Sequence, residues 1–110
     1  MADEKILTNA QEDESSTLVK FSKAYRFEGK DYTEVDLSGM DDLSAEDMIA
    51  ADRYLTRGGS FSVMPEMTLE YACFIAARAA KQPIEFFRGL PPKDALKVKN
   101  RVTSFFYSED

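Results

Sequence analysis

Residues 18–37 read LVKFSKAYRFEGKDYTEVDL, and this stretch decides the first half of the fold. Apolar and aromatic side chains recur at alternate positions from Val19 to Phe27, with Lys23 as the one exception, and a second alternating run ends at Val35 and Leu37. Such alternation is typical of strands with one buried face. Gly29 lies in the polar stretch between the two runs. The sequence therefore predicts a β-hairpin, which must pack on helices because a lone hairpin is marginal in water.

The pairing register follows from the same pattern. A two-residue turn at Gly29-Lys30 would place Tyr25 opposite Glu34, whereas a three-residue turn that runs through Asp31 pairs Tyr25 with Val35 and Phe27 with Thr33. A slip of one residue moves every side chain to the other face of a strand. The apolar pattern therefore favours the three-residue turn.

Three longer helices are predicted after the hairpin. Ser44 is a good N-cap for the first, which ends at Gly58, and Thr68 begins the second, which must end before Pro83. The third begins near Pro92, and a short helical turn at residues 84–88 precedes it. We therefore predict an α+β fold: an N-terminal β-hairpin packed on a bundle of three main α-helices plus a short helical turn.

The first sixteen residues differ in composition from the rest of the chain. Residues 1–16 contain five acidic residues and only Ile6 and Leu7 as large apolar residues. Such a segment buries too little apolar surface to offset the entropy of ordering. We expect residues 1–16 to form a flexible acidic tail and residues 17–110 to form one domain.

Composition argues against catalysis and metal binding. The chain of 110 residues has no His, the commonest general base, and its single cysteine, Cys73, cannot build a zinc site. The carboxylates of Glu46 and Asp47 fall in the first turn of a predicted helix, where negative charge favours the helix dipole. We expect no catalytic residues, no cofactor and no metal.

Net charge and hydropathy limit the classes of partner that we expect. Acidic residues outnumber basic ones by 20 to 14, so nucleic acid, whose binding needs clustered Lys and Arg, is a poor partner. The N-terminus lacks a secretory signal pattern, and no apolar run approaches the ~20 residues of a membrane span. We expect a cytoplasmic protein with no membrane partner.

Charge is also unevenly distributed along the chain. Residues 34–52 hold seven acidic residues and no Lys or Arg, whereas residues 93–101 carry four basic residues and one Asp. The basic residues are expected mostly to face solvent. Such opposition can steer partners or drive association into a homo-oligomer, and it also fits two segments that simply lie together in one molecule.

The order of these features resembles the small tail assembly chaperones of long-tailed bacteriophages, particularly the Mu-like contractile-tail group. The resemblance covers roughly residues 18–107. It is carried by FEGKDY at 27–32, VDL at 35–37, PIEFF at 83–87, LPPKDA at 90–95 and the closing Val98, Val102, Phe105 and Phe106.

The resemblance implies a non-enzymatic chaperone in the cytoplasm of a bacterial host. Proteins of this family bind the tape measure protein and keep it soluble while the tail tube assembles, and an extended form recruits tail tube subunits. The alternative from charge is a small acidic regulatory protein that binds a cellular protein or mimics the charge of DNA.

Candidate partner-binding residues come from patterning. Methionine and paired aromatic residues offer adaptable apolar contacts, so the candidates are Phe86, Phe87, Phe106, Met64 and Met67, each of which could instead fill the core. On the last helix, Phe105 continues the stripe of core positions and is expected in the core. Its neighbour Phe106 is expected at the margin of the apolar face.

Overall fold

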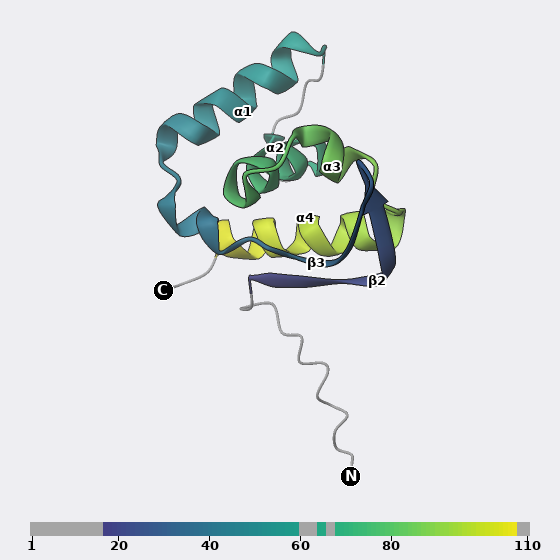
Figure 1. Cartoon of the computed structure of the whole chain (residues 1–110). Coiled ribbons are helices and arrows are strands. Elements are labelled where there is room, and N and C mark those ends of the chain that lie inside the picture. Colours follow the sequence, from purple (N-terminus) through teal and green to yellow (C-terminus); the bar gives the residue numbers. More distant parts are fainter. Residues whose placement is uncertain (1–16, 60–63, 66–67, 108–110) are drawn as a thin grey trace.

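The chain folds as a two-stranded hairpin followed by helices, so the predicted α+β class is confirmed (Figure 1). The computed structural model describes residues 17–59, 64–65 and 68–107, and the predicted tail at 1–16 lies outside this part. Only the 3-10 turn η2 was not predicted. In chain order the elements are β2 (Leu18–Phe27), β3 (Lys30–Asp36), η2 (Ser38–Asp42), α1 (Ala45–Arg57), α2 (Leu69–Ala80), α3 (Ile84–Arg88) and α4 (Pro92–Tyr107).

The predicted register of the hairpin is wrong at its turn. Phe27 pairs with Lys30 and Tyr25 with Tyr32, so the loop has two residues. These are Glu28 and Gly29, with φ angles of 50° and 82°. Two successive positive φ angles give a turn whose twist matches that of the flanking strands, and this turn geometry overrides the side-chain pattern.

A large bulge in β2 shifts the pairing register, so that apolar Val19 and Val35 lie opposite each other at the end of the hairpin away from the turn. Val19 pairs with Val35 and Lys20 with Glu34, so residues 21–24 of β2 lie opposite the single residue Thr33. A bulge leaves its extra residues without partners in the ladder. The alternation in β2 is therefore interrupted, which the sequence pattern did not reveal.

A buried carboxylate from α4 holds this bulge. Asp94 is fully buried, and its Oδ1 accepts a hydrogen bond of 2.9 Å from the backbone N–H of Ser22. Its Oδ2 accepts a second, of 3.1 Å, from the Ser22 hydroxyl. The pair satisfies a donor that the bulge removed from the ladder, and it ties α4 to β2.

Two basic side chains of α4 bind the outer edge of β2. Lys97 Nζ donates to the carbonyl of Lys20 at 2.8 Å, and Arg101 donates to the carbonyl of Leu18 at 3.1 Å. Unpaired strand edges attract other strands, and α4 covers this one. The expectation that these basic residues face away from the fold is therefore wrong for Lys97 and Arg101.

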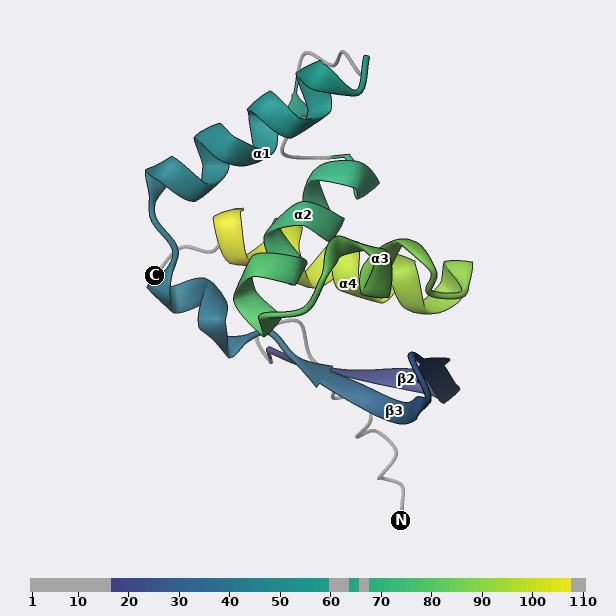
Figure 2. The same ribbon diagram turned by 45° about the horizontal axis from the view of Figure 1, so that its top comes forward.

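Helix α2 is the centre of the core, with α3, α4 and η2 packed around it (Figure 2). Its small side chains let neighbouring backbones come close. One close approach is at Gly39 in η2, where an added Cβ would collide with the Ala79 carbonyl. Seven of the twelve residues of α2 are buried, which are Tyr71, Ala72, Cys73, Ile75, Ala76, Ala77 and Ala79.

Helix α1 begins with the predicted cap. The Ser44 hydroxyl accepts from the backbone N–H of Glu46, and the Asp47 carboxylate accepts from the backbone N–H of Ser44 at 2.9 Å. The helix ends at Gly58, as predicted. Figure 1 shows α1 on the far side of α2 from the hairpin, and none of the described helices is long and apolar enough to span a membrane.

Candidate functional site

Large apolar side chains remain exposed around α1 and the segment that follows it. Ile49 is 52% exposed, Met64 is 48% exposed and Met48 is 37% exposed. Single exposed apolar residues are normal, but neighbouring ones commonly mark an interaction surface. In the part of the chain that the structure describes, the other exposed large apolar residues are Leu18, Leu69, Leu96 and Tyr107.

Helical geometry explains why the α1 side chains stay exposed. Ala51 and Leu55 face the core and are buried. Met48 precedes Ala51 by three residues and lies at the border of this buried stripe, whereas Ile49 lies about 200° away from Ala51 around the helix. Because α1 packs mainly on α2, no other described element covers its outer side.

These side chains border a shallow hollow of about 190 Å³. Met48, Ile49, Asp52, Pro65 and Tyr71 line it, and exposed Met64 precedes Pro65 in the chain. Tyr71 forms the floor, with only 2% of its surface exposed. The set of Met48, Ile49, Met64, Pro65 and Tyr71 is called the α1 patch below.

Phe106 supports the α1 patch from α4. Its ring meets the Tyr71 ring edge to face, with 6.0 Å between the ring centroids. Phe105 and Phe106 contact each other at 5.8 Å, and both are half-buried. Phe106 thus lies at the margin of the core, as expected. Phe105, which was expected in the core, is only half-buried as well, because the end of α4 extends beyond the fully enclosed core.

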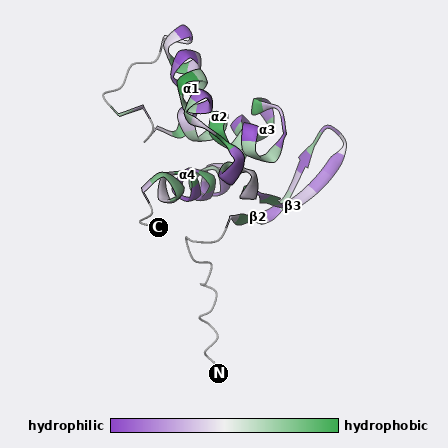
Figure 3. Ribbon diagram, turned by 90° about the vertical axis from the view of Figure 1, so that its left-hand side faces the viewer, coloured by the Kyte–Doolittle hydropathy of each residue, from purple (hydrophilic) through white to green (hydrophobic). Residues whose placement is uncertain are grey.

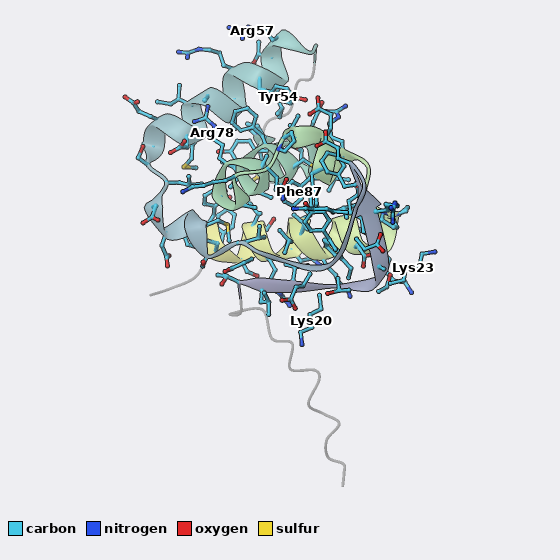
Figure 4. All side chains as sticks on the ribbon, in the orientation of Figure 1. Lys20, Lys23, Tyr54, Arg57, Arg78 and Phe87 are labelled. Carbon is cyan, nitrogen blue, oxygen red and sulfur yellow. The ribbon has the colours of Figure 1, made fainter. Side chains whose placement is uncertain are left out.

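Phe86 and Phe87 fill the core, the alternative that the sequence left open for each candidate, and they offer a partner almost no exposed surface. They are 0% and 1% exposed. The Phe86 ring lies 4.9 Å from the rings of both Tyr32 and Phe87, and Tyr25 donates to the Phe86 carbonyl at 2.8 Å. Figure 4 shows Phe87 pointing into the interior beside α4. The aromatic face of the hairpin covers this pair, which the linear sequence could not show.

The structure thus brings two of the five predicted residues to one region. Met64 lies in the α1 patch and Phe106 packs on its floor, whereas Met67 lies outside the described residues. Sequence reasoning missed Met48 and Ile49 as members of this surface. Ile49 carried a usable signal, because its helical position lies off the stripe of Ala51 and Leu55.

Polar contacts hold the opposite side of α1 against α2. Arg78 donates to the Asp47 carboxylate at 2.6 Å, and its guanidinium carbon lies 5.0 Å from the centroid of the Phe74 ring. The Tyr54 ring packs on the same Phe74, with a centroid distance of 5.2 Å. Figure 4 shows Arg78 and Tyr54 between the two helices. These contacts fix the orientation of α1 on α2.

A second hollow, of about 570 Å³, lies between α2, α3 and α4. Cys73, Phe87, Leu90 and Ala95 contribute apolar lining, and Arg88 is among its polar residues. Burial raises the pKa of the Cys73 thiol, which keeps it protonated and a poor nucleophile at neutral pH. Cys73 is therefore a small, buried residue of the core.

Comparisons with protein-family models, curated proteins and solved structures find no match. The function is accordingly argued from the α1 patch, the charge of the chain and the order of its sequence features.

Proposed function

We propose that this protein is a non-catalytic phage tail assembly chaperone that binds the tape measure protein and keeps it soluble while the tail tube assembles. The observation that carries the proposal is the α1 patch, where exposed Met48 and Ile49 line a hollow with buried Tyr71, and exposed Met64 precedes the lining residue Pro65 in the chain. In this proposal the protein acts in the cytoplasm of a bacterial host, and an extended form would recruit tail tube subunits.

The chemistry of the α1 patch suits an apolar helical partner. An amphipathic helix can lay its apolar face into a shallow groove and contribute side chains at positions i, i+3, i+4 and i+7. The two methionines have flexible, polarisable side chains that adapt to irregular partner surfaces. A long tape measure chain offers many similar apolar stripes, so adaptable contacts are more useful than a rigid pocket.

Net charge supports the same role. The chain carries a formal charge of −6, which favours solubility of a complex that covers apolar surface. Figure 3 shows hydrophilic residues concentrated on the outer part of the hairpin, away from α1 and α2. The molecule thus combines an apolar contact region at α1 with charged surface elsewhere, as a soluble holdase requires.

Co-expression with the tape measure protein of the same genome tests the proposal. We expect the soluble fraction of the tape measure protein to rise with the wild-type protein and to fall again with Ile49→Glu. Leu96→Glu is a matched control, because Leu96 is also 52% exposed but lies on α4, outside the α1 patch. Circular dichroism checks that both variants fold.

Two results would count against the proposal. A tape measure protein that stays insoluble with the wild-type chain contradicts the chaperone role itself. Equal loss of solubility with Ile49→Glu and Leu96→Glu contradicts the assignment to the α1 patch.

The alternative, a small acidic regulatory protein, also has an observation in its favour. The seven acidic residues at 34–52 remain on the folded surface, with Asp47 half-buried and the other six exposed. A DNA mimic or charge-driven regulator needs no apolar groove, however, and the α1 patch has no role in it. Binding that survives Ile49→Glu but disappears in 0.5 M salt, where screening shortens the Debye length to about 4 Å, would favour this alternative.

A further inference from the structure

The two outer edges of the hairpin differ in what covers them. Residues of α4 bind the outer carbonyls of β2, whereas within the described part of the chain the sheet has two strands and nothing pairs with the far side of β3. In Figures 2 and 3, β3 lies on the side of the hairpin away from α4. Among the residues that the structure describes, the far side of β3 is therefore an open strand edge.

The hydrogen-bond pattern identifies which residues face outward. In antiparallel pairs, residues alternate between those bonded to the partner strand and those directed away from it. The backbone N–H of Leu37 donates to the Thr17 carbonyl at 2.8 Å, so the backbone groups of Leu37 point to β2. Those of Val35, two residues earlier and paired with Val19, point to β2 as well. The backbone N–H and C=O groups of Glu34 and Asp36 consequently point to the open edge.

The side chains at these positions are acidic and exposed. Glu34 and Asp36 lie on the solvent face, while Val35 between them is 8% exposed and faces the core. On β2, the basic residue Lys20 lies directly opposite Glu34, and the apolar residue Leu18 lies opposite Asp36. A strand added to β3 would place alternate side chains directly beside the two carboxylates.

Charge selects what can pair there. A second copy of β3 would bring acidic side chains against acidic ones, and like charges directly opposite destabilise a pair of strands. Opposite charges in the same positions contribute favourably. We propose that β3 is a strand-addition site for an extended segment of another protein that carries Lys or Arg at alternate positions. This site is separate from the α1 patch and does not depend on the function proposed for it.

Peptide binding tests this inference on the full-length protein. The probe is a labelled nine-residue peptide of alternating valine and lysine, compared with the same peptide in which glutamate replaces lysine. Fluorescence anisotropy at 50 mM salt should show binding of the lysine peptide at least ~10-fold tighter than of the glutamate peptide, since several cross-strand pairs change sign.

Two kinds of variant separate backbone pairing from charge. Glu34→Pro removes one outward N–H without touching the β2–β3 ladder, as proline at an open edge does, and should abolish peptide binding. The double variant Glu34→Gln and Asp36→Asn keeps the edge open and should weaken binding of the lysine peptide by roughly 2- to 10-fold. Glu85→Gln, an exposed charge change on α3, is the control and should leave binding unchanged.

Several outcomes would overturn the inference. These are equal binding of both peptides, no binding of the lysine peptide at 1 mM, or loss of binding that is as large with Glu85→Gln. A doubled mass in sedimentation that Glu34→Pro abolishes would instead show that β3 pairs with a second copy. If Glu34→Pro does not fold, the comparison of the double variant Glu34→Gln and Asp36→Asn with the control Glu85→Gln still decides the result.

Discussion

Replacing Asp94 is the most informative change to the fold, because this one side chain joins α4 to the bulge in β2. In Asp94→Ala, the Ser22 N–H and hydroxyl lose both acceptors. A partly buried donor left unsatisfied costs about 1–3 kcal/mol, and loss of an acidic residue from the first turn of α4 adds roughly 0.3–1 kcal/mol. We expect the free energy of unfolding to fall by about 1–4 kcal/mol.

Variants that remove one hydrogen bond at a time show whether the two bonds to Ser22 account for the loss of stability in Asp94→Ala. Asp94→Asn keeps an acceptor for the Ser22 N–H and should cost about 1 kcal/mol, as should Ser22→Ala, which removes only the hydroxyl bond. In a double-mutant cycle, Ser22→Ala should add little to Asp94→Ala because the two share one interaction. Urea unfolding followed by circular dichroism measures each value. A loss below ~0.5 kcal/mol for Asp94→Ala would refute the role assigned to this carboxylate.

Two further predictions concern α2 and its neighbours. Gly39→Ala should destabilise the fold by about 1–3 kcal/mol, because the new Cβ meets the Ala79 carbonyl, and an unchanged melting temperature would contradict this close packing. The backbone N–H of Ser44, and then the Arg78 guanidinium, hold the pKa of Asp47 below its ordinary value of 3.8. The stabilisation is therefore present above pH 3.8 and is lost as the pH falls through the lowered pKa of the folded state. Asp47→Asn should flatten the acid limb of the stability curve measured by urea unfolding between pH 2 and 6, and an unaltered limb would contradict the assignment.

Most of the helical half of the fold could be predicted from the sequence because its signals are local. Ser44, Thr68 and the glycine at 58 act within a few residues of the helix ends that they define. The short helix at Ile84–Arg88 was predicted for the same reason, since Pro83 and Gly89 bound it. The turn η2 escaped prediction because its glycine is required by contact with a distant carbonyl, that of Ala79.

The hairpin register could not be predicted because it depends on two long-range facts. A two-residue turn with positive φ angles sets the pairing near Tyr25, and a bulge held by Asp94 shifts it before Lys20. Asp94 is 72 positions from its partner Ser22 in the chain. Period-two reasoning treats a strand as uninterrupted and cannot detect such a bulge.

The candidate site was predicted only in part. Residue type identified Met64 and Phe106, which the fold brings to the α1 patch and its support. The same criterion selected Phe86 and Phe87, which the aromatic face of the hairpin buries. Exposure depends on which element covers a residue, so residue type alone could not separate the two groups.

Methyl NMR of the full-length protein, titrated with an amphipathic helical segment of the tape measure protein, tests the central claim most directly. The account predicts that the methyl signals of Met48, Ile49 and Met64 shift together and saturate with one affinity, while those of Leu96 stay in place. Shifts confined to Leu96 and other residues outside the α1 patch, or no shifts at saturating segment concentrations, would contradict it.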